Sequence, residues 1–262
     1  MSIAYLSNKK ISYTTKGSGP ALVLLHGYLE SKEVWDSFSK LLDNYKLIIP
    51  DLPGHGVSEV VGEAHSMDLM ADAVAAVLAK EQVEKCIIYG HSMGGYAAEA
   101  FARKYPKKTR AIGLVHSTVY PDNEEKKANR KREIALLREG KQKLVVSGML
   151  PKIVAKSNLE RLRPELEKIV ERANNFPANG IIAVLNGMMM RPEHTINPAI
   201  PFHIVGGDED NFIPASVYKK MAADNPTVQL DMIEGVGHAS FIEKPDELAH
   251  KIKAFISGNV DK

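Results

Sequence analysis

The chain of 262 residues contains one cysteine, Cys86, so it cannot form an intramolecular disulfide. That scarcity favours a reducing compartment. Residues 1–10 lack the apolar core of a signal peptide, and no apolar run approaches the ~20 residues that span a bilayer. The net charge of +2 gives no bulk electrostatic reason to bind nucleic acid or an anionic membrane. We therefore expect a cytoplasmic protein whose partner is a small molecule, and the composition leaves open whether it is a monomer or a homodimer.

What the sequence does contain is a regular alternation of strand-like and helical segments. With 44% hydrophobic and 25% charged residues, its composition is that of a soluble globular protein. Short apolar runs predict an opening hairpin and then buried strands at 3–15, 21–25, 46–51, 86–90, 110–115, 201–205 and 228–233. Segments between and after these runs predict helices at 31–42, 67–79, 94–104, 215–223 and 245–256. This alternation is typical of an α/β protein with a mostly parallel sheet and helices on both faces.

The alternation stops in the middle of the chain, where no strand pattern is found. Helical patterns cover 123–139, 158–174 and 181–190 instead. We therefore divide the chain into a core domain, residues 1–121 and 200–262, and an inserted helical cap at 122–199. The Lys/Arg-rich stretch 126–132 predicts a solvated helix face, which does not by itself imply an acidic substrate.

A glycine-rich motif lies between an expected strand and an expected helix. Residues 90–95 are Gly-His-Ser-Met-Gly-Gly, which contains the pattern Gly-x-Ser-x-Gly. Where a strand turns into a helix within one residue, the serine takes a strained backbone conformation and presents its hydroxyl at the top of the sheet. Gly90 and Gly94 leave room for this turn, and the helix start directs N–H groups toward whatever the serine attacks. The motif therefore predicts Ser92 as a nucleophile in an elbow.

Four motifs, each at the end of an expected strand, together resemble the α/β-hydrolase family from about residue 21 to 256. They are His26-Gly27, the run Asp-Leu-Pro-Gly-His-Gly-Val-Ser at 51–58, the elbow at Ser92, and Gly-Val-Gly-His at 235–238. The order of serine, acid and histidine along the chain also matches the family. The resemblance implies a doubly wound, mostly parallel sheet of eight strands with a helical cap, and a serine hydrolase that needs no cofactor.

The resemblance also implies a catalytic triad. Its base is His238, whose loop resembles the family's histidine loop. The acid has three candidates at 208–210, and alignment on Gly207 and on the apolar pair and proline at 212–214 selects Asp210. Asp208 is second and Glu209 third. Some relatives place the acid one strand earlier, but residues 116–120 contain no carboxylate, so we reject that variant here.

The same family pattern places two backbone N–H groups in an oxyanion hole, those of Tyr28 and Met93. His26 is expected to brace the loop of Tyr28, and His55 the loop after its own strand. No cluster with ligand-like spacing predicts a metal site. Candidate substrate-binding side chains are Tyr28, His91, Met149 and Met188.

The predicted reaction is hydrolysis of an ester-like bond in a small apolar carboxylic ester or thioester through an acyl-enzyme. A C–C bond hydrolase, a lactonase or a cofactor-free oxygenase would use the same fold and much of the same triad. A ligand-sensing binding protein with a retained triad is a different class. Repeated turnover distinguishes an enzyme from such a receptor.

Overall fold

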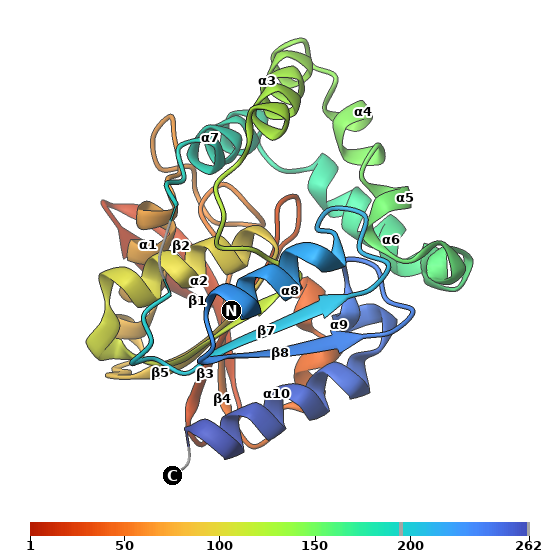
Figure 1. Ribbon diagram of the computed structural model, residues 1–262. Helices are drawn as coiled ribbons and strands as arrows, with labels where there is room; N and C mark the ends of the chain where they lie inside the picture. The colour runs from red at the N-terminus through yellow and green to blue at the C-terminus, as the bar shows by residue number, and fades with distance from the viewer. Residues whose placement is uncertain (194–195, 261–262) are drawn as a thin grey trace.

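The computed structural model describes residues 1–193 and 196–260, and it contains one sheet with the strand order β1-β2-β4-β3-β5-β6-β7-β8 (Figure 1). The strands are β1 (Ser2–Leu6), β2 (Lys9–Lys16), β3 (Ala21–Leu25), β4 (Lys46–Pro50), β5 (Cys86–His91), β6 (Thr109–Val115), β7 (Phe202–Gly207) and β8 (Val228–Ile233). β1 and β2 form the expected hairpin, and β2 also pairs antiparallel with β4. The remaining pairs are parallel. The predicted eight-stranded, mostly parallel sheet is therefore confirmed.

The central strands are buried on both faces, as their continuous apolar runs predict. In β3, Val23 and Leu25 belong to one hydrophobic core, whereas Leu22 and Leu24 belong to the other. Successive side chains of a strand point to opposite faces, so an apolar run without alternation fills both cores at once.

Helices cover each face of the sheet. The first core contains side chains of α1 (Met67–Lys80), α2 (Met93–Lys104) and α8 (Ala215–Asp224). The second contains side chains of α10 (Pro245–Asn259) and of the short α9 (Ser240–Glu243). A single 3₁₀ turn, η3 (Pro106–Lys108), leads from α2 into β6. The sheet thus lies between two helical layers.

The segment between β6 and β7 contains only helices among its described residues. They are α3 (Glu124–Arg138), α4 (Gln142–Ser147), α5 (Leu150–Ile153), η4 (Lys156–Asn158), α6 (Leu159–Asn174) and α7 (Ala178–Met189). Figure 1 shows these inserted helices gathered on one side of the sheet, with the arrowheads of β7 and β8 directed toward α6. The boundaries of a separate cap at residues 122 and 199 remain a prediction.

The prediction of a single helix over residues 31–42 is wrong. The structure has two 3₁₀ turns there, η1 (Lys32–Trp35) and η2 (Phe38–Leu41). Trp35, Phe38 and Leu41 are spaced by three, which is the repeat of a 3₁₀ helix, and a short segment does not separate that period from 3.6. The buried Lys32 is also held from outside the segment, because Asp51 accepts both its backbone N–H and its ammonium group.

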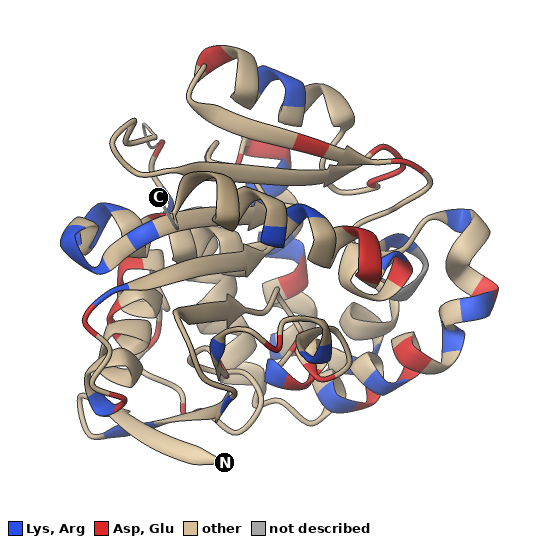
Figure 2. Cartoon of the chain, turned by 90° about the horizontal axis from the view of Figure 1, so that it is seen from below, with Lys and Arg blue, Asp and Glu red and all other residues tan. Residues whose placement is uncertain are grey.

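Figure 2 shows Lys and Arg interspersed with Asp and Glu along the helices in view, in keeping with the small net charge. In the described part of the chain, no helix combines the length and the apolar character needed to cross a bilayer.

Candidate active site

Ser92 occupies a strained turn between β5 and α2, as the motif predicts. Its backbone has φ 50° and ψ −116°, a conformation that L-residues rarely adopt. A Cβ at Gly90 would lie 2.1 Å from the carbonyl oxygen of Gly94, so the turn requires glycine there. The Ser92 N–H donates to Val115 at 3.0 Å, and the Ser117 hydroxyl donates to the Ser92 carbonyl at 2.7 Å. The strain is thus held by contacts with the next strand and the loop that follows it.

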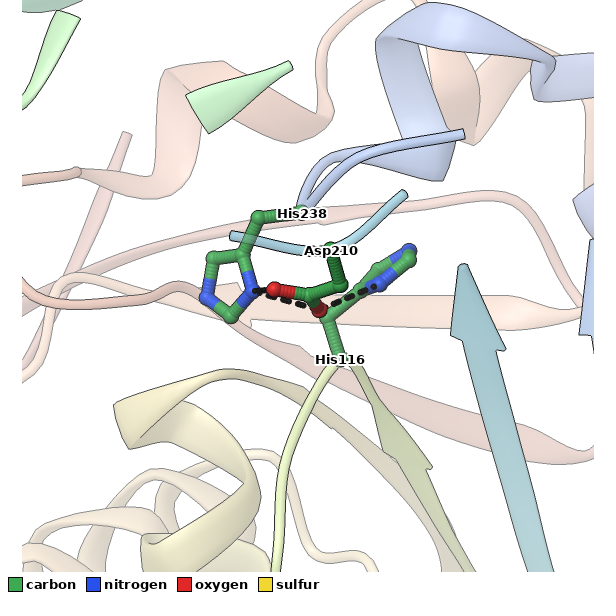
Figure 3. Close-up of side chains that lie close together, drawn as sticks. All are labelled: His116, Asp210 and His238. Carbon is green, nitrogen blue, oxygen red and sulfur yellow. Dashed lines mark hydrogen bonds and ion pairs between the residues drawn. The ribbon is translucent and has the colours of Figure 1, made fainter. Parts of the chain in front are cut away.

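The structure brings Asp210, and neither Asp208 nor Glu209, to His238. The Nδ1 atom of His238 lies 2.9 and 2.8 Å from the two carboxylate oxygens of Asp210 (Figure 3). Asp208 and Glu209 are exposed. Because Nδ1 carries the donated proton, the lone pair of a neutral His238 is on Nε2, which points away from Asp210 in Figure 3.

The carboxylate of Asp210 is buried and accepts several further hydrogen bonds. The backbone N–H groups of Phe212 and Ile213 donate to Oδ1 at 2.8 and 3.0 Å, and the Tyr218 hydroxyl donates to Oδ2 at 2.6 Å. Burial alone would raise the pKa of Asp210, but the positive charge of a protonated His238 and the hydrogen bonds from His116 and His238 hold that pKa far below its usual range. Asp210 is therefore an ionised acceptor.

His116 is a residue of this site that the sequence did not reveal. It follows β6, at the position rejected for lacking a carboxylate, and has a positive φ of 50°. Its Nε2 accepts the N–H of Ser240 at 3.1 Å, so its proton is on Nδ1, 3.2 Å from Oδ2 of Asp210. Burial lowers the pKa of His116, and its hydrogen bond to Asp210 offsets this only in part. His116 is thus a neutral donor that helps to hold the acid.

The loop after β3 lies beside the elbow, as an oxyanion hole requires. Neither the Tyr28 nor the Met93 N–H takes part in the loop and turn hydrogen bonds of the described residues. His26 Nδ1 donates to the carbonyl of Gly27 at 2.8 Å, so His26 braces this loop as expected. Met93 is the first residue of α2, where an N–H has no partner within the helix.

His55 contacts this first loop as well as its own. Its Nε2 accepts the N–H of Leu29 at 3.3 Å, while Nδ1 lies 3.4 Å from the carbonyl of Pro53. His55 thus contacts the loop after its own strand, as expected, and the loop after β3 in addition.

A family model described as the alpha/beta hydrolase family matches residues 22–251. The chain belongs to this family. The α/β-hydrolase is 30% identical to Lipase 1 of Psychrobacter immobilis over 98% of its own chain and 83% of that protein. It is 25% identical to the pimeloyl-[acyl-carrier protein] methyl ester esterase of Aeromonas hydrophila, over 94% of this chain and 99% of that protein. A solved structure of a thermophilic esterase from Thermogutta terrifontis, with malate bound, matches with a TM-score of 0.91 at 28% identity, over 98% of this chain and 97% of that one.

Ser92 and His238 of the hydrolase line one cavity of about 700 Å³. The inserted helices supply much of its wall. In the described residues no hydrogen bond joins the Ser92 hydroxyl to His238, and catalytic hydrogen bonds of this kind often form only with substrate bound. The four candidate substrate-binding residues all lie on the cavity wall: Tyr28, His91, Met149 and Met188.

Two of these residues have further contacts. The Tyr28 hydroxyl donates to Glu133 of α3 at 3.1 Å, so it connects the loop after β3 to the inserted helices. His91 is only 2% exposed, and both of its ring nitrogens are bonded, Nδ1 to Glu30 at 2.9 Å and Nε2 to the carbonyl of His238 at 2.7 Å. Neither ring nitrogen of His91 is therefore free to bind a substrate.

The Lys/Arg-rich stretch of α3 is only partly a solvated face. Lys127 and Lys131 are absent from the cavity wall, whereas Lys126, Arg130 and Arg132 line it. The interpretation of the whole stretch as a solvated face is therefore wrong for Arg130, which pairs with the buried Asp122, whereas Arg132 is exposed as predicted.

His116, Asp210 and His238 also form the one group in the described chain whose ligand atoms converge as a metal site would require, within 4.8 Å of one another (Figure 3). No ligand spacing in the sequence indicates this group, because its three residues come from three separate loops. The Nδ1 atom of each histidine donates a proton to the same carboxylate, so neither has a lone pair available for a cation there. The donor set thus fits a hydrogen-bonded acid better than a metal centre.

The loop of His238 is bonded to the inserted segment. The His238 N–H donates to the carbonyl of Ile153 at 2.9 Å. The buried Glu243 accepts the N–H groups of both Gly237 and Ala155, at 2.9 and 2.8 Å. A Cβ at Gly237 would lie 2.3 Å from the nitrogen of Ala155, so the two backbones touch. The position of His238 therefore depends on the residues around Ile153.

Proposed function

We propose that this hydrolase, which acts on ester bonds, cleaves a small carboxylic ester or thioester with a largely apolar acyl part through an acyl-enzyme on Ser92. The proposal rests on one observation above all. A serine on a strained elbow and a histidine oriented by a buried, ionised carboxylate line the same cavity.

In the proposed reaction the Ser92 hydroxyl attacks the carbonyl carbon while Nε2 of His238 takes its proton. Asp210 holds the imidazole in the required tautomer and stabilises the imidazolium that forms. The N–H groups of Tyr28 and Met93 stabilise the negative oxygen of the tetrahedral intermediate. The alcohol or thiol leaves with the proton from His238.

Hydrolysis of the acyl-enzyme repeats these steps with water. His238 takes a proton from the water, which attacks the acyl carbonyl, and returns it to Ser92 as the acid is released. The inserted helices form the wall opposite the elbow and would limit the access of bulk water. A low-dielectric site of this kind strengthens each hydrogen bond to the developing charge.

A panel of p-nitrophenyl esters of increasing acyl length tests the proposal. We expect repeated turnover, with a preference for acyl chains that fit the apolar part of the cavity. Lactones and amides are measured beside the esters. Turnover of lactones alone would replace the proposal by a lactonase, and a single turnover followed by tight retention would indicate a receptor.

A further inference from the structure

The charges on the cavity wall are not balanced. Basic side chains on the wall come from α3 and α5: Lys126, Arg130, Arg132 and Lys152. The acidic side chains on the wall are Glu30 and Glu133. The chain as a whole has a net charge of only +2, so the excess on the wall is a local feature.

Several of these charges are neutralised by specific partners. Glu30 forms a buried pair with His91, and Arg130 forms one with Asp122, whose oxygen lies 2.5 Å from its Nε. Burial raises the pKa of Glu133, and this rise is opposed by the hydrogen bond from Tyr28 and by the charges of Arg130 and Lys152. Lys126 and Arg132 take no part in these interactions.

Lys126, Arg132 and Lys152 form no ion pair with any carboxylate in the part of the chain that the structure describes. Nη1 of Arg132 donates instead to the neutral amide oxygen of Asn129 at 2.7 Å. Lys126 is half-buried, whereas Arg132 and Lys152 are exposed at the solvent side of the cavity. A cleft lined by charge of one sign focuses the field and attracts ligands of the opposite sign.

Apolar side chains of other inserted helices also line the cavity. Val145 and Val146 belong to α4, Ile169 and Val170 to α6, and Met188 to α7. The cavity is therefore amphipathic, with charge on α3 and α5 and apolar surface on the remaining inserted helices. Such a wall suits a ligand that is itself an apolar chain with a charged end.

We propose that the hydrolase prefers esters that carry a carboxylate on the part of the molecule that fills the cavity over neutral esters of the same length. The apolar chain lies against α4, α6 and α7, and its carboxylate lies beside Lys126 and Arg132. This inference rests on the proposed function, because it concerns the substrate of the same site.

The test compares two methyl esters with acyl chains of equal length, monomethyl adipate, which ends in a carboxylate, and methyl hexanoate, which ends in a methyl group. Methanol release is the measurement. Because methanol is small, only the acyl part of either ester fills the cavity. At low salt we expect kcat/KM for monomethyl adipate to exceed that for methyl hexanoate by about tenfold. This is the lower end of the increase in association rate that a charged cleft produces. The preference should fall toward unity at ~0.5 M salt, where the screening length is only a few ångströms.

The double variant Lys126→Gln/Arg132→Gln should remove most of this preference by lowering kcat/KM for monomethyl adipate far more than for methyl hexanoate. Its matched control is Lys127→Gln/Lys131→Gln. Each control position is a sequence neighbour of a test position, the change in net charge is the same, and neither side chain lines the cavity. The control should keep the full preference.

Turnover of methyl hexanoate also shows that each variant folds. Equal kcat/KM for the two esters, or an equal loss of preference in test and control variants, would overturn the substrate inference while leaving the esterase intact. Absence of Ser92-dependent hydrolysis of both esters would overturn the proposed function and this inference with it.

Discussion

His91 donates a hydrogen bond from Nε2 to the backbone carbonyl of His238 at 2.7 Å, so the residue before the elbow serine holds the loop of the proposed base. Its Nδ1 donates to Glu30, which also accepts the Gly27 N–H at 2.6 Å. A carbonyl and a carboxylate are both acceptors, and therefore both ring nitrogens are protonated. One buried imidazolium thus connects three segments around Ser92.

The ion pair of His91 and Glu30 predicts that part of the free energy of unfolding depends on pH. Burial opposes the charge of each group, but their mutual attraction and hydrogen bond raise the pKa of His91 above 6.5 and lower that of Glu30 below 4.5. The contribution of His91 is complete below its unfolded pKa and is lost as pH rises through its folded pKa. That of Glu30 is present above its unfolded pKa and is lost as pH falls through its folded pKa. Both are therefore complete between pH 4.5 and 6.5.

We expect His91→Gln to lower the free energy of unfolding by about 3 kcal/mol in that window, since it leaves Glu30 buried without its partner. The difference from wild type should shrink as pH rises above the window. Urea unfolding at several pH values measures it, with His250→Gln on the exposed face of α10 as the control. A difference that is constant from pH 5 to 9 would contradict the assignment of charge to this pair.

Ser92→Ala should abolish hydrolysis of p-nitrophenyl esters, with a loss in kcat of at least about 10³-fold. The fold should remain, because alanine occupies little space and no hydrogen bond of the Ser92 hydroxyl exists in the described residues. Steady-state kinetics and a thermal melt of the same sample measure both. Near wild-type turnover by the folded variant would remove Ser92 from the mechanism.

Asp210→Asn should lower kcat by roughly 10³–10⁴-fold, because an amide does not enforce the tautomer of His238 that leaves Nε2 free. Asp208→Asn is the matched control, two residues away on the same loop. The exposed Asp208 carboxylate accepts a single hydrogen bond from the described residues, from the Val236 N–H at a long 3.4 Å, so the loss in kcat should be far smaller. The reverse ranking of the two variants would place the acid at Asp208.

Prolonged treatment with a metal chelator should leave esterase activity unchanged. The Nδ1 atoms of His116 and His238 both donate to Asp210, and the proposed steps require no Lewis acid. The measurement is kcat before and after chelation and dialysis. A loss that added Zn²⁺ restores would show that the three residues form a metal centre instead.

The sequence predicts the fold correctly where the local hydrophobic pattern agrees with burial in the folded protein. β3 is an apolar run of strand length whose alternate residues fill two cores. The prediction of one α-helix over 31–42 was wrong because the spacing of Trp35 and Phe38 fits both the 3₁₀ repeat of three residues and the α-helical repeat of 3.6. The contact of Lys32 with Asp51 is also too distant in sequence for a local pattern to show.

The sequence predicts only those residues of the site that lie in recognisable motifs. Ser92, Asp210 and His238 stand in recognisable patterns at strand ends, and the structure brings the last two together. His116 and Glu30 stand in no such pattern, since each acts through a contact across the fold. The sheet order still contains a signal for His116, because β6 and β7 are neighbours and the loops that follow them meet at one edge.

The bonds between the His238 loop and the residues around Ile153 bear on how segments can be exchanged between relatives. A graft cut at residues 122 and 199 would replace the backbone that positions His238 as well as the walls that select substrate. A graft that ends before Ile153 would change α3 and α4 while leaving Ala155 and Asn158 on Glu243. We expect chimeras of the second kind to keep their turnover and change their preference, so the modular unit of this hydrolase is smaller than its whole helical insertion.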